Sequence, residues 1–551
     1  MRLHLIIFLP NVYIYIRKWF RMQLPTDRPS SIEKLTATEV DLLVIGGGLT
    51  GAGIALDAAS RGMVTILIDR ADVGSGASTH TSNILHAGFP LLKRGFRQLI
   101  RKLGPERKIL LDNALHIINP QHVLLPIDKK LALGRFRMNR QFNTYDKLTG
   151  NDKHHRHQVL KRASAIRQEP TLEPNAISGA VVWEEYATRD HRLLLEVLKK
   201  AQELGAIILP QMEANKPLYG EGGTLTGYEV LDMDSNTPHT IKAAVVINCQ
   251  GTWMPETQYE SMLHAIVPKD KLPVKQAIYY YQDQEEVPYY MRPLSNHWVQ
   301  LGGKVSRSIS GGPIARPTAQ DVTHLLNSIA QYFNAPLLQV PEVAYVWHES
   351  YLMEHAKFNW KNSAYKDEKD AFYALNPAIG HYRLCAQQAV DLIVHHLQEK
   401  GQLTRIKECY TDLLKISGSE FLSHDEYLNF SRDLLQNADT MHLKPEAIQH
   451  LLNLYGKNAE LILGHYNTLP PDDNDPDIRL LSAEVWYAVH YEWALHLDDF
   501  LIRRTRRFLT HPQTIASEVN RVAEFMGREL NWDRLRREEE VKRYEEAIKM
   551  L

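Results

Sequence analysis

The stretch TSNILHAGFPLLK, at residues 81–93, carries side chains that can take part in an oxidation. Its histidine, His86, follows a polar Thr–Ser–Asn run and precedes the small pair Ala87–Gly88, which would let a bulky planar group approach closely. A neutral imidazole near physiological pH can accept the proton of a substrate hydroxyl group. We therefore predict that His86 is a catalytic base. The alternative is that it only forms a hydrogen bond to a bound group or to the backbone.

A GxGxxG turn upstream of this stretch predicts a dinucleotide site. The turn follows an apolar strand expected at 41–45 and opens a helix of small residues expected at 52–61. A second strand, expected at 64–68, ends at Asp69. In such a βαβ unit the glycines make the turn and admit a pyrophosphate to the backbone, and the acidic residue accepts hydrogen bonds from a ribose. The alternative is a glycine-rich turn of an unrelated α/β protein. The glycines of the motif are Gly46, Gly48 and Gly51.

The remaining elements predict an α/β fold followed by helices. An amphipathic helix ending at Gly205 leads through a short strand and a hairpin to a buried strand that runs into Gly251. Residues 265–355 are rich in Val, Tyr and Gln in short runs, which is typical of a mixed sheet. From about residue 405 the pattern is helical, and apolar residues at three- and four-residue steps predict one long helix over Ser482–Phe508.

Composition excludes several functional classes. A net charge of −1 over 551 residues gives no overall attraction to nucleic acid. The three cysteines form no CxxC pair, which argues against a disulfide framework or a cysteine zinc site and fits a reducing cytoplasm. We expect the KHHRH run at 153–157 to be solvated, and the acidic stretch at 469–477 lacks the glycine and glutamate of a calcium loop. No metal site is predicted.

Two further segments leave alternatives open. Residues 1–21 are either an interfacial anchor with aromatic and basic residues, or sequence upstream of a true start at Met22. Four arginines crowd the end of the expected long helix, at positions 503, 504, 506 and 507. They are either a solvated helix end favoured by the helix dipole, or a contact with anionic lipid or another domain.

From about residue 40 to its end, the chain resembles the FAD-dependent glycerol-3-phosphate dehydrogenases and oxidases. The resemblance rests on the glycine-rich start, on DHRLLL, INCQGTW and HYRLCAQQAVD, and above all on the C-terminal AEVWYAVHYEWALHLDDFLIRRTR. It implies an FAD domain of the glutathione-reductase type, a substrate domain with a sheet and a helical cap. We therefore expect a tail at 1–40, an FAD-dependent oxidoreductase domain at 41–404 with a substrate subdomain at about 265–355, and a helical C-terminal domain at 405–551.

The same resemblance implies what the protein binds and where it acts. It implies FAD as the cofactor and a small-molecule substrate, with glycerol 3-phosphate oxidised to dihydroxyacetone phosphate and the electrons passed to quinone. Respiratory members of the family sit on the membrane surface. A peripheral position on the inner face of the cytoplasmic membrane is therefore implied, and a homodimer is left open.

Carried onto this sequence, the family pattern keeps the cofactor positions better than the substrate positions. Family members have a lysine where Asn83 stands, an arginine near Tyr351 and a lysine at Ala378. Without these cations a phosphate group is held weakly. We predict that Lys304, in the LGGKV turn, and then Arg383 replace them, and that glycerol 3-phosphate reduces the flavin weakly or not at all. The expected cofactor-binding residues are Gly46, Gly48, Gly51, Asp69, Ser78, Thr79, Ser82, Asn83, Ala214, Gly251 and Gly380.

Three functions therefore stay open. The first is an active dehydrogenase of this family, and the second is a flavoprotein that oxidises a different small hydroxy or amino substrate. The third is an inactive paralogue with a structural or regulatory role. We expect the C-terminal helical region to serve stability or assembly, so that a chain cut after about residue 405 keeps its flavin.

Overall fold

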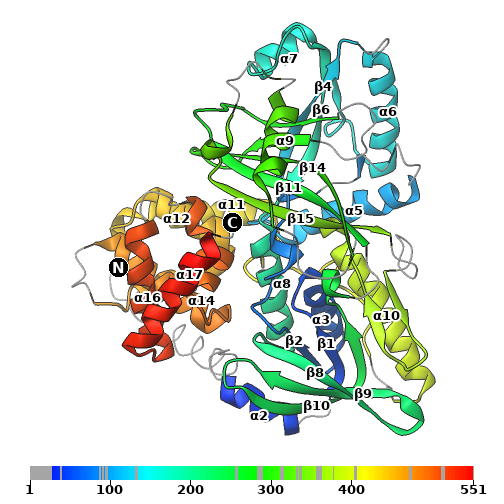
Figure 1. The fold of residues 1–551 in the computed structure, drawn as a ribbon, viewed down its shortest axis with the longest axis vertical. Helices are drawn as coiled ribbons and strands as arrows, with labels where there is room; N and C mark the ends of the chain where they lie inside the picture. Colours follow the sequence, from blue (N-terminus) through cyan, green and yellow to red (C-terminus); the bar gives the residue numbers. More distant parts are fainter. Residues whose placement is uncertain are drawn as a thin grey trace, which may run out of the picture.

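The computed structural model describes residues 28–37, 40–85, 88–89, 92, 97–130, 134–254, 258–281, 289–310, 316–330, 333, 338–354, 363–376, 378–402, 406–470, 475–510 and 515–549. The predicted anchor or upstream segment at 1–21, with Met22, and the predicted base His86 lie outside these residues. The rest forms a region around a parallel sheet, a region around a mixed sheet and a group of C-terminal helices beside both (Figure 1).

The parallel sheet is built on the predicted βαβ unit, which the structure confirms. Strand β1 (Val40–Ile45) lies between β2 (Thr65–Ile68) and β10 (Thr237–Asn248) and pairs in parallel with both. Helix α3 (Leu49–Arg61) connects β1 to β2 and ends at Gly62, which has a left-handed φ of 96°. The small residues of α3 are buried almost throughout, so the helix packs tightly against the sheet.

Further strands and helices complete this region. The strand order is β16-β17-β10-β1-β2-β7, and the hairpin of β8 and β9 pairs with the first half of β10. Helices α8 and α10 pack against α3 and cover the sheet (Figure 1). The elements are α2 (Arg28–Ala37), β7 (Ile207–Leu209), β8 (Met212–Tyr219), β9 (Leu225–Asp232), β16 (Ala364–Lys366), β17 (Phe372–Ala374), α8 (Asp190–Glu203) and α10 (Tyr382–Glu399).

The mixed sheet starts much earlier in the chain than the 265–355 expected from sequence. Its order is β15-β11-β14-β13-β12-β4-β6-β3, with β5 on β6, and β12 runs parallel to β4. Four of its strands come from residues before 190, because the sheet joins segments that are distant in sequence. The strands are β3 (Ile84–Leu85), β4 (Asn119–Asp128), β5 (Gln158–Lys161), β6 (Ile177–Ala187), β11 (Gln258–Pro268), β12 (Ala277–Tyr280), β13 (Tyr289–Pro293), β14 (Trp298–Ser310) and β15 (Tyr345–Glu354).

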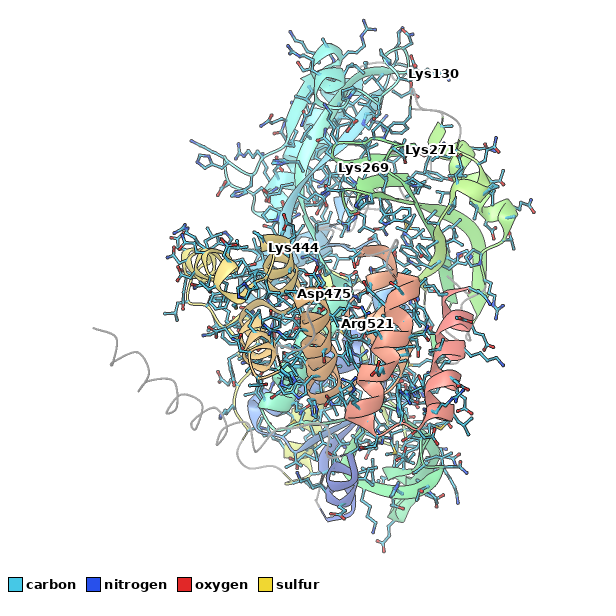
Figure 2. The ribbon with its side chains drawn as sticks, turned by 90° about the vertical axis from the view of Figure 1, so that its left-hand side faces the viewer. Lys130, Lys269, Lys271, Lys444, Asp475 and Arg521 are labelled. Carbon is cyan, nitrogen blue, oxygen red and sulfur yellow. The ribbon has the colours of Figure 1, made fainter. Side chains whose placement is uncertain are left out.

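Helices flank the mixed sheet and form the C-terminal region. Figure 2 shows the C-terminal region, with Lys444, Asp475 and Arg521, below the mixed-sheet region with Lys130, Lys269 and Lys271. In the part of the chain that the structure describes, no helix is both long and apolar enough to cross a bilayer. The helices are α5 (Arg97–Asn113), α6 (Gly134–Thr149), α7 (Arg162–Gln168), α9 (Ala319–Ala330), α11 (His424–Gln436), α12 (Pro445–Tyr455), α13 (Ala459–Tyr466), α14 (Pro476–Tyr491), α15 (Arg507–Thr510), α16 (Ile515–Leu530) and α17 (Arg534–Ile548).

The prediction of one long helix over Ser482–Phe508 is wrong. Helix α14 ends at Tyr491, Trp493 has a left-handed φ of 54°, and a separate turn of π-helix, η8 (Asp499–Arg504), follows. The chain turns here because the Glu492 side chain is drawn into a buried ion pair with Arg192 of α8. This pairing overrides the helical periodicity of the apolar residues.

Candidate functional site

A cavity of about 470 Å³ opens at the carboxyl ends of β1, β2 and β10. Its wall continues to β15 and to the loop that precedes α10, so both sheets contribute to it. This is the edge at which open α/β sheets bind their ligands, and the volume suits a small molecule or part of a cofactor. Of the residues predicted from sequence, Gly46, Gly48, Asp69, Ser78, Ala214 and Gly251 line the cavity.

The glycine-rich turn has no room for side chains. A Cβ on Gly51 would lie 2.0 Å from the Gly46 carbonyl oxygen, and a Cβ on Gly46 would lie 2.7 Å from the Cys249 carbonyl oxygen. Gly46 also has a φ of 113°, which L-amino acids with side chains rarely adopt. Gly48 lines the cavity at the start of α3, so the positive end of the helix dipole faces the space where a pyrophosphate would lie.

Asp69 holds the turn in place from the end of β2. Its Oδ2 accepts a hydrogen bond from the Gly47 N–H at 2.7 Å, and its Oδ1 accepts one from the Ala71 N–H at 2.9 Å. Burial raises the pKa of Asp69 to about 6, although the two backbone hydrogen bonds oppose this shift. Arg70, Met212 and Ala214 lie along the same end of the cavity. This end therefore fits the ribose and base of a dinucleotide.

A carboxylate that could exchange protons with a substrate lies on the mixed-sheet side of the cavity. Glu349 of β15 lines the wall, and its Oε2 lies 2.8 Å from Nε2 of His264, a fully buried residue of β11. The other ring nitrogen of His264 lies 2.6 Å from the hydroxyl group of Tyr290. Gln300 donates to that hydroxyl group at 2.9 Å, so the tyrosine proton is free to go to His264 and the imidazole N–H to Glu349.

This arrangement was not predicted from sequence. His264 and Glu349 lie 85 residues apart, and the antiparallel register of β11 and β15, in which Met262 pairs with Glu349, brings them together. A single histidine inside the apolar run MLHAIV is the signal that marks a buried, hydrogen-bonded group.

Several predicted cofactor residues lie behind the wall of the cavity. The Thr79 hydroxyl group donates to the Gly74 carbonyl at 2.7 Å, and the Asn83 carbonyl accepts from Arg292 at 3.0 Å. These contacts shape the loop that contains both residues. In this loop Thr81, and not Thr79 or Asn83, lines the cavity. Among the residues that the structure describes, the cavity wall does not include Gly51, Thr79, Ser82, Asn83 or Gly380.

The structure does not bring the two predicted substitute cations to the cavity. The Lys304 ammonium group lies 3.3 Å from Glu260 on the neighbouring strand. Arg383 donates to Glu106 from Nε at 2.7 Å and from a terminal nitrogen at 2.5 Å. Both side chains are paired with carboxylates, and neither is among the residues that line the described cavity, so their predicted contact with the substrate stays a prediction.

The structure decides two further sequence interpretations. For the arginine run at 503–507 it favours the contact with another region over the solvated helix end, since Arg504 is fully buried and contacts Asp72 of the parallel-sheet region. In the KHHRH run, residues 153–156 are exposed as expected, whereas the His157 ring is buried and lies 2.7 Å from the Asp146 carboxylate. No group of three or more metal-ligating side chains occurs among the described residues, and the three cysteines are free.

Comparison with known proteins gives two matched ranges. A family described as FAD dependent oxidoreductase matches residues 41–355, and one described as the C-terminal domain of alpha-glycerophosphate oxidase matches residues 409–537. The aerobic glycerol-3-phosphate dehydrogenase of Staphylococcus epidermidis is 27% identical over 547 residues, which covers 96% of this chain and 98% of that protein.

Solved structures share the fold. The glycerol-3-phosphate dehydrogenase from Bacillus halodurans, complexed with FAD, superposes with a TM-score of 0.79 at 23% identity, over 96% of this chain and 98% of that one. The L-alpha-glycerophosphate oxidase from Mycoplasma pneumoniae superposes with a TM-score of 0.52 at 15% identity, over 65% of this chain and 95% of that one. The fold class predicted from sequence is confirmed.

Proposed function

The chain belongs to the FAD dependent oxidoreductase family, and from this premise we propose that it oxidises glycerol 3-phosphate to dihydroxyacetone phosphate. The carrying observation is that the C-terminal range matches a glycerophosphate oxidase domain, while a glycerol-3-phosphate dehydrogenase aligns over 96% of the chain. The same proposal includes quinone as the electron acceptor, a peripheral position on the inner face of the cytoplasmic membrane, and a homodimer. Family resemblance alone supports these three.

The cavity residues fit FAD. Asp69 would hold the ribose of the adenosine, and the N-terminus of α3 at Gly48 would hold the pyrophosphate. The wall formed by Thr81, Glu349 and Asn376 is then left for the flavin and the substrate. When bound, FAD accepts the hydride that leaves the substrate carbon.

Within this arrangement, the side chains of the protein handle the proton. The Glu349 carboxylate would take the proton of the substrate hydroxyl group, and the His264 N–H would hold the carboxylate in position. Tyr290 fixes the imidazole tautomer from the other side. His86 remains a prediction for the same role, and it lies outside the described residues.

A second candidate substrate is a small hydroxy or amino compound without a phosphate group. Glu349 favours it, because a carboxylate in the wall repels a phosphate and attracts an ammonium group. At the Glu349 end of the described wall, no lysine or arginine offsets this charge. The loss of a charge-assisted phosphate contact weakens binding by about two orders of magnitude.

Anaerobic stopped-flow measurement of flavin absorbance tests the substrate. We expect glycerol 3-phosphate to reduce the flavin, but with weak, millimolar-range affinity, because the Glu349 end of the described wall offers a carboxylate instead of a cation. The comparison compounds are glycerol, a small hydroxy acid and a small amine. Reduction by one of these, with none by saturating glycerol 3-phosphate, would reject the first candidate in favour of the second.

Replacing Glu349 with glutamine is expected to slow flavin reduction by about 10²- to 10⁴-fold, because the general base is lost while the hydrogen bond from His264 is kept. The flavin spectrum should be unchanged. The matched control is Glu342→Gln, whose carboxylate lies 3.1 Å from Lys271 and outside the described cavity wall. If His86→Ala abolishes reduction and Glu349→Gln does not, the base is His86.

The pH dependence of FAD binding tests Asp69. Its pKa in the folded protein is raised to about 6, so the carboxylate is protonated as the pH falls from 7.5 to 5. A ribose that needs the carboxylate as acceptor should then bind less tightly, with the Kd of FAD rising by up to about tenfold per pH unit below 6. Asp69→Asn should bind FAD weakly at every pH. A wild-type Kd that is flat over this range, measured by flavin fluorescence, would contradict the assignment.

A further inference from the structure

Two arginines of the C-terminal region hold a buried aspartate next to the cavity. Arg504 donates to Asp72 from two nitrogens, at 2.6 and 2.8 Å, and Arg503 donates to the same carboxylate at 2.5 Å. Asp72 is buried, which would raise its pKa, but the two guanidinium groups outweigh burial and hold the pKa at about 2. The carboxylate is therefore charged at all ordinary pH values.

A third arginine reaches the same loop further along. Arg506 donates to the Thr79 carbonyl at 2.6 Å and to the Asn83 side-chain oxygen at 3.4 Å. Burial lowers the pKa of Arg506 to about 10, with Asp190 opposing this shift. Its backbone has a φ of 50°, a left-handed conformation that costs energy in a residue other than glycine. We call Arg503, Arg504 and Arg506 the arginine clasp.

The loop held by the clasp is part of the cofactor site. Gly74 and Ser78 line the cavity between the two contact points. The Gly74 N–H donates to the Gly47 carbonyl at 3.1 Å, and the Leu49 N–H donates to the Ser78 hydroxyl group at 2.9 Å. The loop therefore ties the clasp directly to the glycine-rich turn at the start of α3.

The clasp is equally fixed on its C-terminal side. Arg504 also donates twice to the Glu492 carbonyl, at 2.9 and 2.6 Å. Arg503 donates to Asp498 at 2.5 Å and also to Asp499. Each of these two guanidinium groups therefore has hydrogen-bond partners in both regions. It fixes the loop around Asp72 relative to the C-terminal region.

We propose that the C-terminal helical region is a functional part of the FAD site, and that the arginine clasp holds the 72–83 loop in its binding conformation. FAD then meets a loop that is already ordered, so binding carries a smaller entropy cost. By linkage, bound FAD must stabilise the docked C-terminal region by the same factor. This replaces the expectation that a chain lacking this region would keep its flavin.

The test compares two buried arginines of the C-terminal region in the full-length protein. Arg504→Met removes the contact with Asp72, whereas the control Arg507→Met removes ion pairs with Glu484 and Glu518 that stay within the C-terminal region. We expect the Kd of FAD to rise about 10- to 100-fold in Arg504→Met and to stay within about twofold of wild type in Arg507→Met, although both variants lose thermal stability. Arg504→Lys, which keeps the charge, should recover part of the affinity.

A second measurement covers the case in which Arg504→Met does not fold. Hydrogen exchange of the wild-type protein, with and without FAD, should show that FAD protects the backbone amides of residues 495–506 as well as those of 72–83. Arg506→Met, whose lost hydrogen bonds are to neutral oxygens, should raise the Kd of FAD severalfold. Equal FAD affinity in the Arg504, Arg506 and Arg507 variants, or no FAD-dependent protection of 495–506, would overturn the proposal.

Discussion

Arg192→Met is expected to lower the free energy of unfolding by about 3–5 kcal/mol. Arg192 of α8 is fully buried and donates to both oxygens of Glu492, at 2.9 and 2.5 Å, as well as to Glu196. It also donates to the Leu454 carbonyl at 2.9 Å and lies 4.5 Å from the centre of the Tyr455 ring. Removing it leaves two buried carboxylates, Glu196 and Glu492, whose remaining ion-pair partner among the described residues is Lys199.

The expected cost is large compared with the stability of a typical protein. Breaking a buried ion pair by removing one partner costs about 3–5 kcal/mol, and a folded protein is stable by only about 5–15 kcal/mol. Urea denaturation followed by circular dichroism measures the loss. The control is Lys200→Met on the same helix, whose pairs with Glu203 and Glu420 are partly exposed, with an expected cost of at most about 1 kcal/mol. Equal stability of the two variants would contradict this account of the cluster.

Gly51→Ala is expected to yield protein without bound FAD. The new Cβ would lie 2.0 Å from the Gly46 carbonyl oxygen and 3.2 Å from the Val44 side chain. Because the closer atom belongs to the backbone, a rotamer change cannot relieve the clash, and the turn that receives the pyrophosphate must move. We expect FAD binding at least about a hundredfold weaker and a colourless preparation.

The control for this variant is a glycine with free space around it. Gly464 lies in α13, no atom is within 4 Å of its added Cβ, and alanine is the better helix former. Gly464→Ala should keep its flavin and lose no stability. Visible absorbance of the purified proteins decides the matter, and a yellow, fully loaded Gly51→Ala protein would show that the turn accommodates a side chain.

The parts of the fold that were predictable from sequence are those whose determinants are local. The glycines of the turn, the small residues of α3 and the β-branched residues of β2 each fix their own conformation, so the βαβ unit could be placed within a few residues. The long helix at 482–508 could not be corrected from sequence. The partner that breaks it, Arg192, lies 300 residues before Glu492.

Candidate site residues follow the same division. Gly46, Gly48 and Asp69 belong to one short motif, and the structure brings them to one cavity. Arg383 looked available for a substrate because its partner Glu106 lies 277 residues away and carries no motif. Glu349 was missed for the converse reason, since only the register of β11 with β15 places it beside His264.

The distance in sequence between the two sides of the arginine clasp has a consequence during synthesis. Arg504 is made 432 residues after Asp72, and a ribosome adding about 5–20 residues per second needs about 20 to 90 s to cover that distance. Until then the nascent chain contains the 72–83 loop without the arginines that neutralise Asp72 and hold the loop in place. Because the arginine clasp is proposed to order this loop, tight binding of FAD is expected only after residues 503–506 have emerged from the ribosome, and the incomplete chain should bind FAD weakly.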